Sequence, residues 1–209
     1  MLKRLFDILF SASCLVILGP LFIIIAVIIK CEDGGPVFYR GIRIGRSGRP
    51  FRIFKFRTMV VNAEKIGPSS TAKGDTRITG IGRVLRSYKI DELPQLINIL
   101  KGDMSVVGPR PQVGWAVELY TDEEKRILLG IKPGITDYAS IKFSNEDEIL
   151  AGSPDPDKCY MEKIHPEKMR LSMEYAKNMS IGNDLIIILK TLFTIARKGN
   201  NHAKKETAA

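Results

Sequence analysis

The chain has 209 residues, of which 32 are Lys or Arg and 23 are Asp or Glu, so its formal net charge is +9. This length suits one compact domain with an added membrane segment and is short for two full soluble domains. The positive charge favours anionic partners, namely phosphates, nucleotides, acidic lipids or nucleic acid. The three cysteines are widely spaced without a metal-ligand pattern, which predicts a reducing compartment and no structural metal.

The first segment of the chain is apolar over a length that suits a membrane. Residues 8–29 carry no charged side chain, and about 20 apolar residues cross a hydrocarbon core. A helix that is apolar on every face would need a much larger domain to bury it. No small-residue cleavage site precedes Lys30, which argues against a secretory signal. We therefore predict that residues 1–33 insert into a membrane.

The residues around and within this segment predict its topology. Lys3 and Arg4 precede it and several arginines follow it, so both flanks are predicted to be cytoplasmic. Gly19 and Pro20 lie in the middle, where proline removes a backbone donor and kinks a helix. The pattern favours a helix that breaks at Gly19 and Pro20 and re-enters the same leaflet. A kinked single span is the alternative.

A basic stretch follows. Residues 37–62 contain no acidic side chain, and a basic residue recurs at nearly every third position. Contact with anionic membrane lipids explains most of these charges, and Lys55 and Arg57 are also candidates for phosphate binding. Glycines and a proline interrupt the stretch between aromatic and aliphatic residues, which predicts short strands in hairpins. Residues 62–79 are rich in Gly, Pro, Ser and Thr and are predicted to form a loop that closes over a ligand.

Two adjacent carboxylates begin the next predicted helix, residues 91–100. Neighbouring side chains on a helix point about 100° apart, so Asp91 and Glu92 are not placed to share a proton. One carboxylate can attack phosphorus while the other holds a divalent cation, and Mg²⁺ accepts one or two carboxylates together with phosphate oxygens. A carboxylate pair in a first helical turn is more often a simple cap. The pair alone is therefore a weak signal.

Basic side chains are presented near this pair. Residues 102–111 predict a short strand that ends in a turn, and Pro109 and Pro111 restrict the backbone on both sides of Arg110. Arg110, together with Arg86 and Lys55, is predicted to bind nonbridging phosphate oxygens. Residues 131–136 predict a second rigid turn.

The C-terminal part of the chain becomes helical and apolar. Residues 181–196 are strongly apolar and are followed by Arg197 and Lys198. They predict a helix that lies along the membrane surface, or one that packs against the first helix. Residues 199–209 are small and polar and are predicted to form a disordered tail.

Several strings of residues closely resemble the bacterial sugar transferase family, the monotopic phosphoglycosyl transferases. The longest strings are Lys89–Leu96 and Leu100–Pro111, and shorter ones cover residues 3–7, 34–38, 54–59 and 132–136. Their order and spacing extend over most of residues 1–140. The chain departs from the family at Gly19, where a serine is expected, and at residues 137–140. We expect residues 137–140 to influence which sugar is transferred.

The resemblance implies a fold and a reaction. The fold is a helix-rich α/β domain with short hairpins in a small monotopic membrane protein: a re-entrant helix at 1–33, a catalytic domain at 34–198 and the tail at 199–209. In the reaction, Asp91 attacks a UDP-sugar and releases UMP, and polyprenyl phosphate then takes the sugar phosphate. Glu92 corresponds to the residue associated with Mg²⁺. The basic family positions, and the motifs that carry substrate-binding residues, are matched by Lys55, Arg57, Arg86, Pro109, Arg110, Pro111 and Thr136.

The resemblance also implies a setting. It places the protein in the bacterial inner membrane with the catalytic domain on the cytoplasmic face, at the first membrane step of glycoconjugate synthesis. No nucleic-acid-binding motif and no stacking pattern of aromatic residues is present, so nucleic acid is not an expected partner. The sequence leaves open which sugar is carried and whether two copies form a homodimer.

Overall fold

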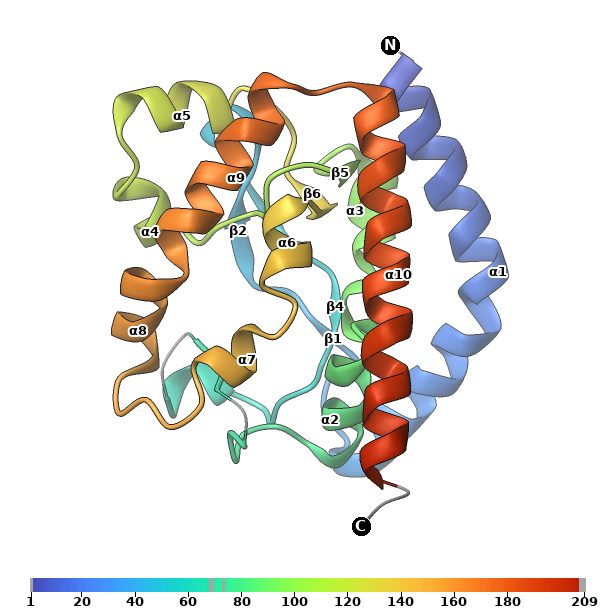
Figure 1. The fold of residues 1–209 in the computed structure, drawn as a ribbon. Coiled ribbons are helices and arrows are strands. Elements are labelled where there is room, and N and C mark those ends of the chain that lie inside the picture. Colours follow the sequence, from blue (N-terminus) through green and yellow to red (C-terminus); the bar gives the residue numbers. More distant parts are fainter. Residues whose placement is uncertain (1, 68–69, 73, 207–209) are drawn as a thin grey trace.

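A computed structural model describes residues 2–67, 70–72 and 74–206. Helices dominate, and the strands are short (Figure 1). The helices are α1 (Leu2–Asp33), α2 (Gly80–Ser87), α3 (Gln95–Lys101), α4 (Gly114–Glu118), α5 (Asp122–Leu128), α6 (Tyr138–Lys142), α7 (Glu146–Ile149), α8 (Pro156–Lys163), α9 (His165–Lys177) and α10 (Ile181–Glu206), with 3-10 turns η1 (Arg46–Gly48), η2 (Ala63–Lys65) and η3 (Ile90–Glu92). The strands are β1 (Phe38–Tyr39), β2 (Ile42–Ile44), β3 (Pro50–Arg52), β4 (Lys55–Phe56), β5 (Ser105–Val107) and β6 (Gly134–Thr136). The predicted helix-rich class with short strands is confirmed.

The described strands form three separate pairs. β1 pairs with β4 and β2 with β3, both antiparallel, so the short strands predicted within residues 37–62 are present. β5 pairs with β6 in parallel. A Cβ atom at Gly134 would lie 2.1 Å from the backbone nitrogen of Gly108. Glycine is therefore required where the chain leaves β5 and enters β6.

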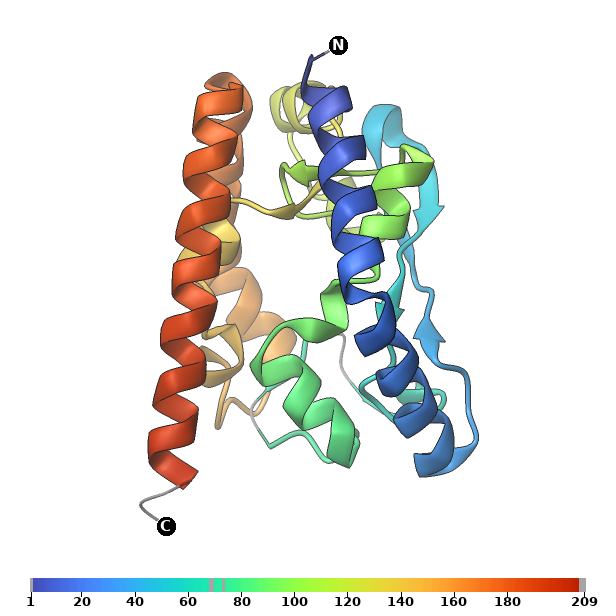
Figure 2. The ribbon, with the colours of Figure 1, turned by 90° about the vertical axis from the view of Figure 1, so that its right-hand side faces the viewer.

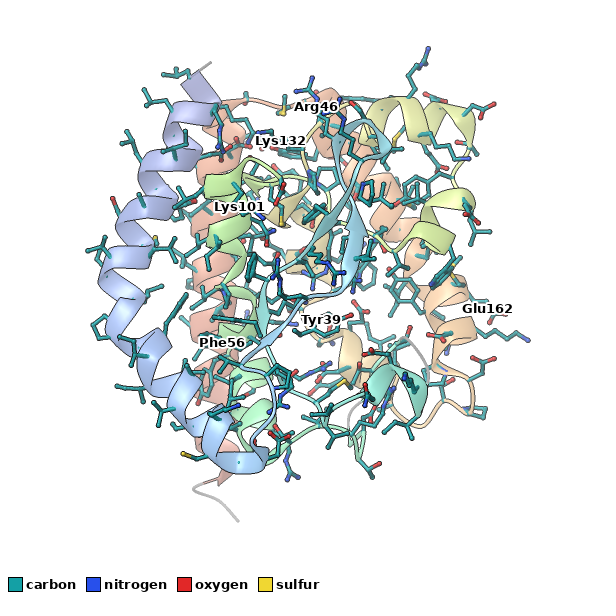
Figure 3. The ribbon with its side chains drawn as sticks, turned by 180° about the vertical axis from the view of Figure 1, so that it is seen from behind. Tyr39, Arg46, Phe56, Lys101, Lys132 and Glu162 are labelled. Carbon is teal, nitrogen blue, oxygen red and sulfur yellow. The ribbon has the colours of Figure 1, made fainter. Side chains whose placement is uncertain are left out.

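The first helix, α1, is continuous through Gly19 and Pro20 and bends near its middle, with its concave side toward the rest of the molecule (Figure 3). Among the described residues it is the one helix long and apolar enough to cross a membrane. A narrow stripe of α1 is buried, at Asp7, Ser11, Ile25 and Ile29. The opposite face exposes large apolar side chains, among them Leu9, Val16, Ile17, Ile23, Ile24, Val27 and Ile28.

The N-terminal end of α1 is bonded to the body of the protein. Arg4 donates hydrogen bonds to the carbonyl oxygens of Ile99 (2.6 Å) and Leu100 (3.0 Å) in α3. The Asp7 carboxylate accepts hydrogen bonds from the Ser105 hydroxyl and the Val106 backbone N–H, both at 3.0 Å, in β5. Charged side chains thus hold the start of an apolar helix against the site-bearing elements.

The C-terminal end of α1 is bonded to the same body. Glu32 accepts a hydrogen bond from the Gly80 backbone N–H at 2.8 Å, at the start of α2. Asp33 forms an ion pair with Arg57, which follows β4. Both ends of the bent helix therefore attach to one domain.

A further group of residues joins the two ends of the chain, and we call it the terminal clasp: Lys3, Val107, Tyr175 and Asp184. The Lys3 ammonium forms an ion pair with Asp184 and donates to the Val107 carbonyl oxygen at 3.1 Å. The Tyr175 hydroxyl lies 2.6 Å from Asp184 Oδ1 and 3.1 Å from the same carbonyl oxygen. Tyr175 and Asp184 are almost fully buried, so the clasp is part of the core.

The long C-terminal helix α10 packs on α6, β5 and β6. Ile187 is buried in the main core, whereas the other side of α10 exposes Leu185, Ile186, Leu189, Leu192 and Phe193. α1 and α10 lie on one side of the molecule and run in the same direction (Figure 2). α10 continues to Glu206, over part of the segment predicted to be a disordered tail, and residues 207–209 lie outside the described residues. The domain boundaries at 33 and 198 stay predictions.

Two apolar clusters position the site. The main core lies under α3 and β5 and is formed by Ile53, Leu96, Ile99, Met104, Val106, Val107, Tyr175 and Ile187. A second cluster joins the C-terminal half of α1 to β4 and α2 through Ile25, Ile29, Phe56 and Leu85. In it, the rings of Phe22 and Phe56 meet edge to face with centroids 5.1 Å apart, and Phe56 lies between α1 and the strands (Figure 3).

Candidate active site

The two candidate carboxylates lie on the 3-10 turn η3, between α2 and α3. Lys89, at the start of this turn, has a left-handed backbone conformation with φ of 58°, which is uncommon for a residue with a side chain. The predicted helix at 91–100 begins later, at Gln95. Pro94 explains this shift, because proline has no N–H to donate and is tolerated only in a first helical turn.

Glu92 is buried and its carboxylate is fully engaged by cations. Arg110 contacts both of its oxygens, with one guanidinium nitrogen 2.9 Å from Oε2, and Lys55 donates to Oε1 at 2.8 Å. Burial alone would raise the pKa of Glu92, but the charges of Arg110 and Lys55 outweigh it and hold that pKa well below its usual range. The Glu92 charge in turn raises the pKa of Arg110. Glu92 therefore favours its charged form and holds two cations.

Asp91 is equally buried but lacks such partners. Its Oδ1 atom is inaccessible and has no hydrogen-bond partner among the described residues. Burial, with the neighbouring charge of Glu92, raises the pKa of Asp91, and the opposing charges of Lys55, Lys89 and Arg86 do not cancel this effect. An under-coordinated carboxylate in a dry site is suited to attack an electrophile or to bind a cation.

The two cations reach Glu92 from different elements. Lys55 lies on β4. The buried Asn98 of α3 holds the segment just before β4: its amide oxygen accepts from the Phe54 N–H at 2.8 Å, and its amide nitrogen donates to the Arg52 carbonyl oxygen at 2.9 Å. Burial lowers the pKa of Lys55. Arg110 follows β5 at the close approach of Gly108 and Gly134 described above. The structure thus brings together four predicted site residues: Lys55, Asp91, Glu92 and Arg110.

Other predicted residues lie around this centre. Arg86 is half-buried on α2, and its charge acts on Asp91. Arg57 is paired with Asp33 at the end of α1, so it does not join Lys55 at Glu92. The Thr136 hydroxyl bonds the Thr191 hydroxyl of α10 at 2.8 Å.

The two prolines beside Arg110 make different contacts. The Pro109 carbonyl accepts from the Gly134 N–H at 2.9 Å, and Pro111 lines a pocket behind Arg110. Gly19 and Pro20, the predicted membrane break, lie within α1. None of these placements assigns a role in binding, and those roles stay predictions.

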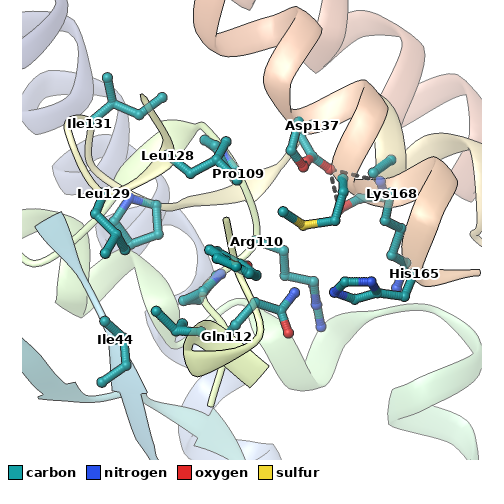
Figure 4. Close-up of a pocket in the computed structure, with 18 of the residues that line it drawn as sticks. Ile44, Pro109, Arg110, Gln112, Leu128, Leu129, Ile131, Asp137, His165 and Lys168 are labelled. Carbon is teal, nitrogen blue, oxygen red and sulfur yellow. Dashed lines mark hydrogen bonds between the residues drawn. The ribbon is translucent and has the colours of Figure 1, made fainter. Parts of the chain in front are cut away.

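A pocket of about 40 Å³ lies behind Arg110, between the β2 end and helices α6 and α9 (Figure 4). His165 points into it, and the ring nitrogen Nε2 of this residue is buried without a hydrogen-bond partner among the described residues. The buried Lys168 forms an ion pair with Glu146 of α7. Asp137 accepts hydrogen bonds from Ser140 and from Ser172, which lies one turn after Lys168 on α9. This volume holds no more than a few small polar atoms.

Sequence reasoning missed several of these residues. Asn98 interrupts the apolar face of a predicted helix, a pattern that could have marked a buried polar anchor. Lys168 and Glu146 carry no comparable signal, because charged residues on helices are usually solvated. Among the described residues, no group of three or more His, Cys, Asp or Glu side chains is arranged as a metal site.

The site is thus a buried carboxylate pair with an oriented guanidinium and ammonium, on a domain that carries one long apolar helix. Such a set is suited to a phosphate-transferring enzyme. The chain matches the bacterial sugar transferase family over residues 1–198, and it belongs to that family. The family's members are transferases, and the sequence-based resemblance is confirmed.

Individual relatives carry specific names. The chain is 36% identical over 196 residues to UDP-N-acetylgalactosamine-undecaprenyl-phosphate N-acetylgalactosaminephosphotransferase of Aeromonas hydrophila, covering 93% of this chain and 43% of the relative. It is 36% identical over 207 residues to the exopolysaccharide production protein ExoY of Rhizobium meliloti, covering 92% and 84%. It is 37% identical over 194 residues to UDP-glucose:undecaprenyl-phosphate glucose-1-phosphate transferase of Klebsiella pneumoniae, covering 91% and 39%. The chain therefore spans less than half of two of these relatives and most of the third.

Proposed function

We propose that this protein transfers a sugar 1-phosphate from a UDP-sugar to a polyprenyl phosphate, the undecaprenyl form in bacteria, through a phosphosugar intermediate on Asp91. The observation that carries this proposal is the contrast within η3. Asp91 has a buried oxygen without a partner, while the adjacent Glu92 is held by Arg110 and Lys55. The names of the relatives supply the substrate classes.

The first half-reaction uses the carboxylate of Asp91. Its carboxylate attacks the phosphorus that carries the sugar, a new P–O bond forms, and the bond from that phosphorus to the bridging oxygen breaks. The electron pair leaves with UMP. Arg110 and Lys55 carry the charge and donors suited to nonbridging phosphate oxygens, and both are bonded to Glu92.

The second half-reaction returns the enzyme to its starting state. A phosphate oxygen of polyprenyl phosphate attacks the same phosphorus, and the P–O bond to Asp91 breaks. Polyprenyl-diphosphate-sugar forms, and the carboxylate of Asp91 is regenerated. No net proton is consumed if the acceptor phosphate enters as a dianion. Arg86 lies on α2, the helix before η3, and its charge acts on Asp91, so it is suited to receive the acceptor phosphate.

The residues of η3 fit a Mg²⁺ ion. Glu92 would offer a carboxylate ligand, and Mg²⁺ would take its other ligands from phosphate oxygens and water. When bound, Mg²⁺ supplies neutralising charge to the diphosphate. Because Glu92 is already bonded to Arg110 and Lys55, it holds the ion only by sharing its oxygens. Chelation of Mg²⁺ is expected to stop UMP release, and added Mg²⁺ to restore it.

The attachment of α1 supports a re-entrant topology. Arg4 and Asp7 at one end of α1, and Glu32 and Asp33 at the other, bond the same domain. A straight crossing would separate the two ends by the thickness of the bilayer, about 30 Å of hydrocarbon. We therefore infer a bent helix that enters and leaves by the cytoplasmic face of the inner membrane. The exposed apolar side of α10 would then lie along the same surface.

The nucleophile is tested with Asp91→Asn. The purified variant is expected to release no UMP from any UDP-sugar, whereas wild-type protein without acceptor releases about one UMP per enzyme. Asp122→Asn, an exposed carboxylate in the first turn of α5, is the matched control and should behave as wild type. Wild-type turnover by Asp91→Asn would overturn the assignment.

The topology is tested by labelling cysteines in intact membranes. A cysteine at Leu2 and the native Cys31 should react with an impermeant maleimide from the same face as a cysteine placed at Ser47 in η1. Reaction of the Leu2 position from the opposite face would establish a single crossing instead.

A further inference from the structure

Basic side chains gather where the start of α1 meets the C-terminal end of α3, and we call them the cation cluster: Arg4, Arg46, Lys101 and Lys132. Arg4 belongs to α1, Lys101 is the last residue of α3, Arg46 begins η1, and Lys132 precedes β6. Seen from behind, the labelled Arg46, Lys101 and Lys132 lie on the side of the molecule toward the N-terminal half of α1 (Figure 3). The fold therefore brings positive charges from distant segments of the chain to one place.

Two of these cations converge on Gly102, the residue that ends α3. A Cβ atom at Gly102 would lie 3.6 Å from a guanidinium nitrogen of Arg4 and 3.7 Å from the ammonium nitrogen of Lys132. Gly102 has a left-handed backbone conformation with φ of 93°, which glycine adopts without strain. Because this residue has no side chain, the space that both cations border stays open.

Both cations keep hydrogen-bond donors that the fold does not use. Arg4 bonds the carbonyl oxygens of Ile99 and Leu100, at the negative end of α3, but a guanidinium carries five N–H donors. The ammonium of Lys132 is half-buried, and no hydrogen bond or ion pair holds it among the residues that the structure describes. An anion above Gly102 could therefore accept hydrogen bonds from both side chains.

The nearby carboxylates do not neutralise this charge. Asp7 accepts its hydrogen bonds from β5, and Asp103 accepts one from the Asn98 amide at 3.1 Å. Burial and the like charge of Arg4 lower the pKa of Lys132, and the opposite charges of both carboxylates do not cancel this effect. The cluster thus has an excess of positive charge that an external anion would relieve.

An apolar surface lies next to the cluster. Leu2, Leu5 and Leu9, in the first turns of α1, are each more than half exposed. Leu100, whose carbonyl oxygen bonds Arg4, is exposed as well. In the re-entrant topology proposed above, this end of α1 lies where lipid meets the cytoplasm. A ligand of the cluster would therefore combine an anionic head with an apolar chain.

The cluster is separate from the candidate active site. Gly102 and the η3 turn lie at opposite ends of α3, whose seven residues span about 10 Å. Glu92 is bonded to Arg110 and Lys55, neither of which belongs to the cluster. An anion bound above Gly102 would therefore leave the carboxylates of η3 unoccupied.

We propose that Arg4 and Lys132 bind the headgroup phosphate of an anionic phospholipid above Gly102, and that this lipid anchors the start of α1 at the membrane surface. The inference goes beyond the proposed function, because it involves neither Asp91 nor the phosphates of donor and acceptor. The remaining N–H donors of Arg4 and the ammonium of Lys132 would each bond a phosphate oxygen. The acyl chains would lie along the exposed leucines of α1.

The proposal is tested by native mass spectrometry of the purified protein, titrated in detergent with dioleoylphosphatidylglycerol. Lys132→Gln should weaken the first lipid-binding step about fivefold, the order of effect of one basic residue near an anionic surface, and Lys132→Arg should restore it. Arg49→Gln removes an exposed charge between η1 and β3 and is the matched control, with wild-type affinity expected. Equal Tm values without lipid show that the variants are folded.

Several outcomes would overturn the proposal. Equal losses of affinity in Lys132→Gln and Arg49→Gln would show a diffuse attraction to the whole basic surface. Equal binding of dioleoylphosphatidylcholine would remove the need for an anionic head, and displacement by an equal concentration of inorganic phosphate would identify a free anion as the ligand. Preferential binding of undecaprenyl phosphate at Lys132 would identify the acceptor instead.

The experiment is independent of the proposed reaction, because lipid binding is measured without a UDP-sugar. A wild-type protein that releases no UMP would refute the proposed function and leave the lipid site standing. Weaker lipid binding by Lys132→Gln, with its UMP burst as in wild type, would support the site. Loss of the UMP burst in Lys132→Gln with unchanged lipid affinity would show that Lys132 serves the substrates, which overturns the proposal.

Discussion

The two sides of the η3 turn carry the same kind of group in opposite surroundings. On one side, Glu92 is bonded to Arg110 and Lys55 and its pKa is lowered. On the other, Asp91 has an unpartnered oxygen and its pKa is raised. A difference of one residue in sequence thus separates a carboxylate that two cations hold from a carboxylate with an unpartnered oxygen. The fold achieves this by aiming two cations at Glu92 from β4 and from the turn after β5.

The largest expected effect comes from removing the carboxylate that two cations hold. Glu92→Gln leaves the partly exposed Arg110 and Lys55 next to a neutral amide. Because Glu92 itself is buried, losing its ion pairs costs at most about 3 kcal/mol of unfolding free energy. UMP release should also fall strongly because both cations lose their orientation. Thermal unfolding and a burst assay in one detergent measure the two effects. An unchanged Tm would show that the cations have another counter-ion.

The next effect concerns the shape of the cation. Arg110→Lys keeps the charge but cannot contact both oxygens of Glu92 in a planar, bidentate manner. We expect kcat/KM for UMP release to fall about ten- to a hundredfold, while the Tm changes less than in Glu92→Gln. Arg126→Lys, in the last turn of α5, serves as the control. Equal activity of Arg110→Lys and wild type would show that Arg110 acts only through its positive charge.

Asp91→Asn should act in the opposite direction on stability. Burial raises the pKa of Asp91 in the folded protein. Above that pKa the wild-type protein bears the cost of a buried charge that the amide lacks, so Asp91→Asn should raise the unfolding free energy. As the pH falls through the folded pKa, wild-type Asp91 takes up a proton and the difference in unfolding free energy between the two proteins narrows, and it vanishes below the unfolded pKa. Tm measured against pH for both proteins checks the sign. A Tm difference between the two proteins that grows toward low pH would contradict the predicted direction of the pKa shift.

The smallest effect is expected away from the turn. Thr191→Val removes the hydroxyl that bonds Thr136 at 2.8 Å, and a neutral hydrogen bond contributes about 1 kcal/mol. The Tm should fall slightly while UMP release is retained. A large loss of activity instead would support the sequence-based prediction that Thr136 binds substrate.

Sequence reasoning reached the centre of the site because short motifs determine it. The prolines around Arg110 and the adjacency of Asp91 and Glu92 are local features, and the structure brings both to one point with Lys55. Their separation into two roles also follows from local geometry, since neighbouring side chains on a helical turn point in different directions.

What the sequence could not supply depends on contacts between distant segments. Lys55 and Arg57 would share a face if β4 continued, but the strand ends at Phe56 and Arg57 turns to Asp33 of α1. Thr136 is paired with Thr191 because α10 covers β6. The direction of the pKa shift at each carboxylate likewise depends on which cations the tertiary fold brings near, and no local pattern encodes that.

The terminal clasp has a consequence for how the chain is made. Lys3 and Asp184 are 181 positions apart, so the ribosome releases the first partner long before the second exists. α1 can enter the membrane early, but its N-terminal end gains its last ion pair only after α10 has emerged. A chain that stops before α10 would leave Lys3 and Tyr175 without their acid and Ile187 missing from the core. Assembly of the domain is therefore completed only after α10 has been made and meets α1.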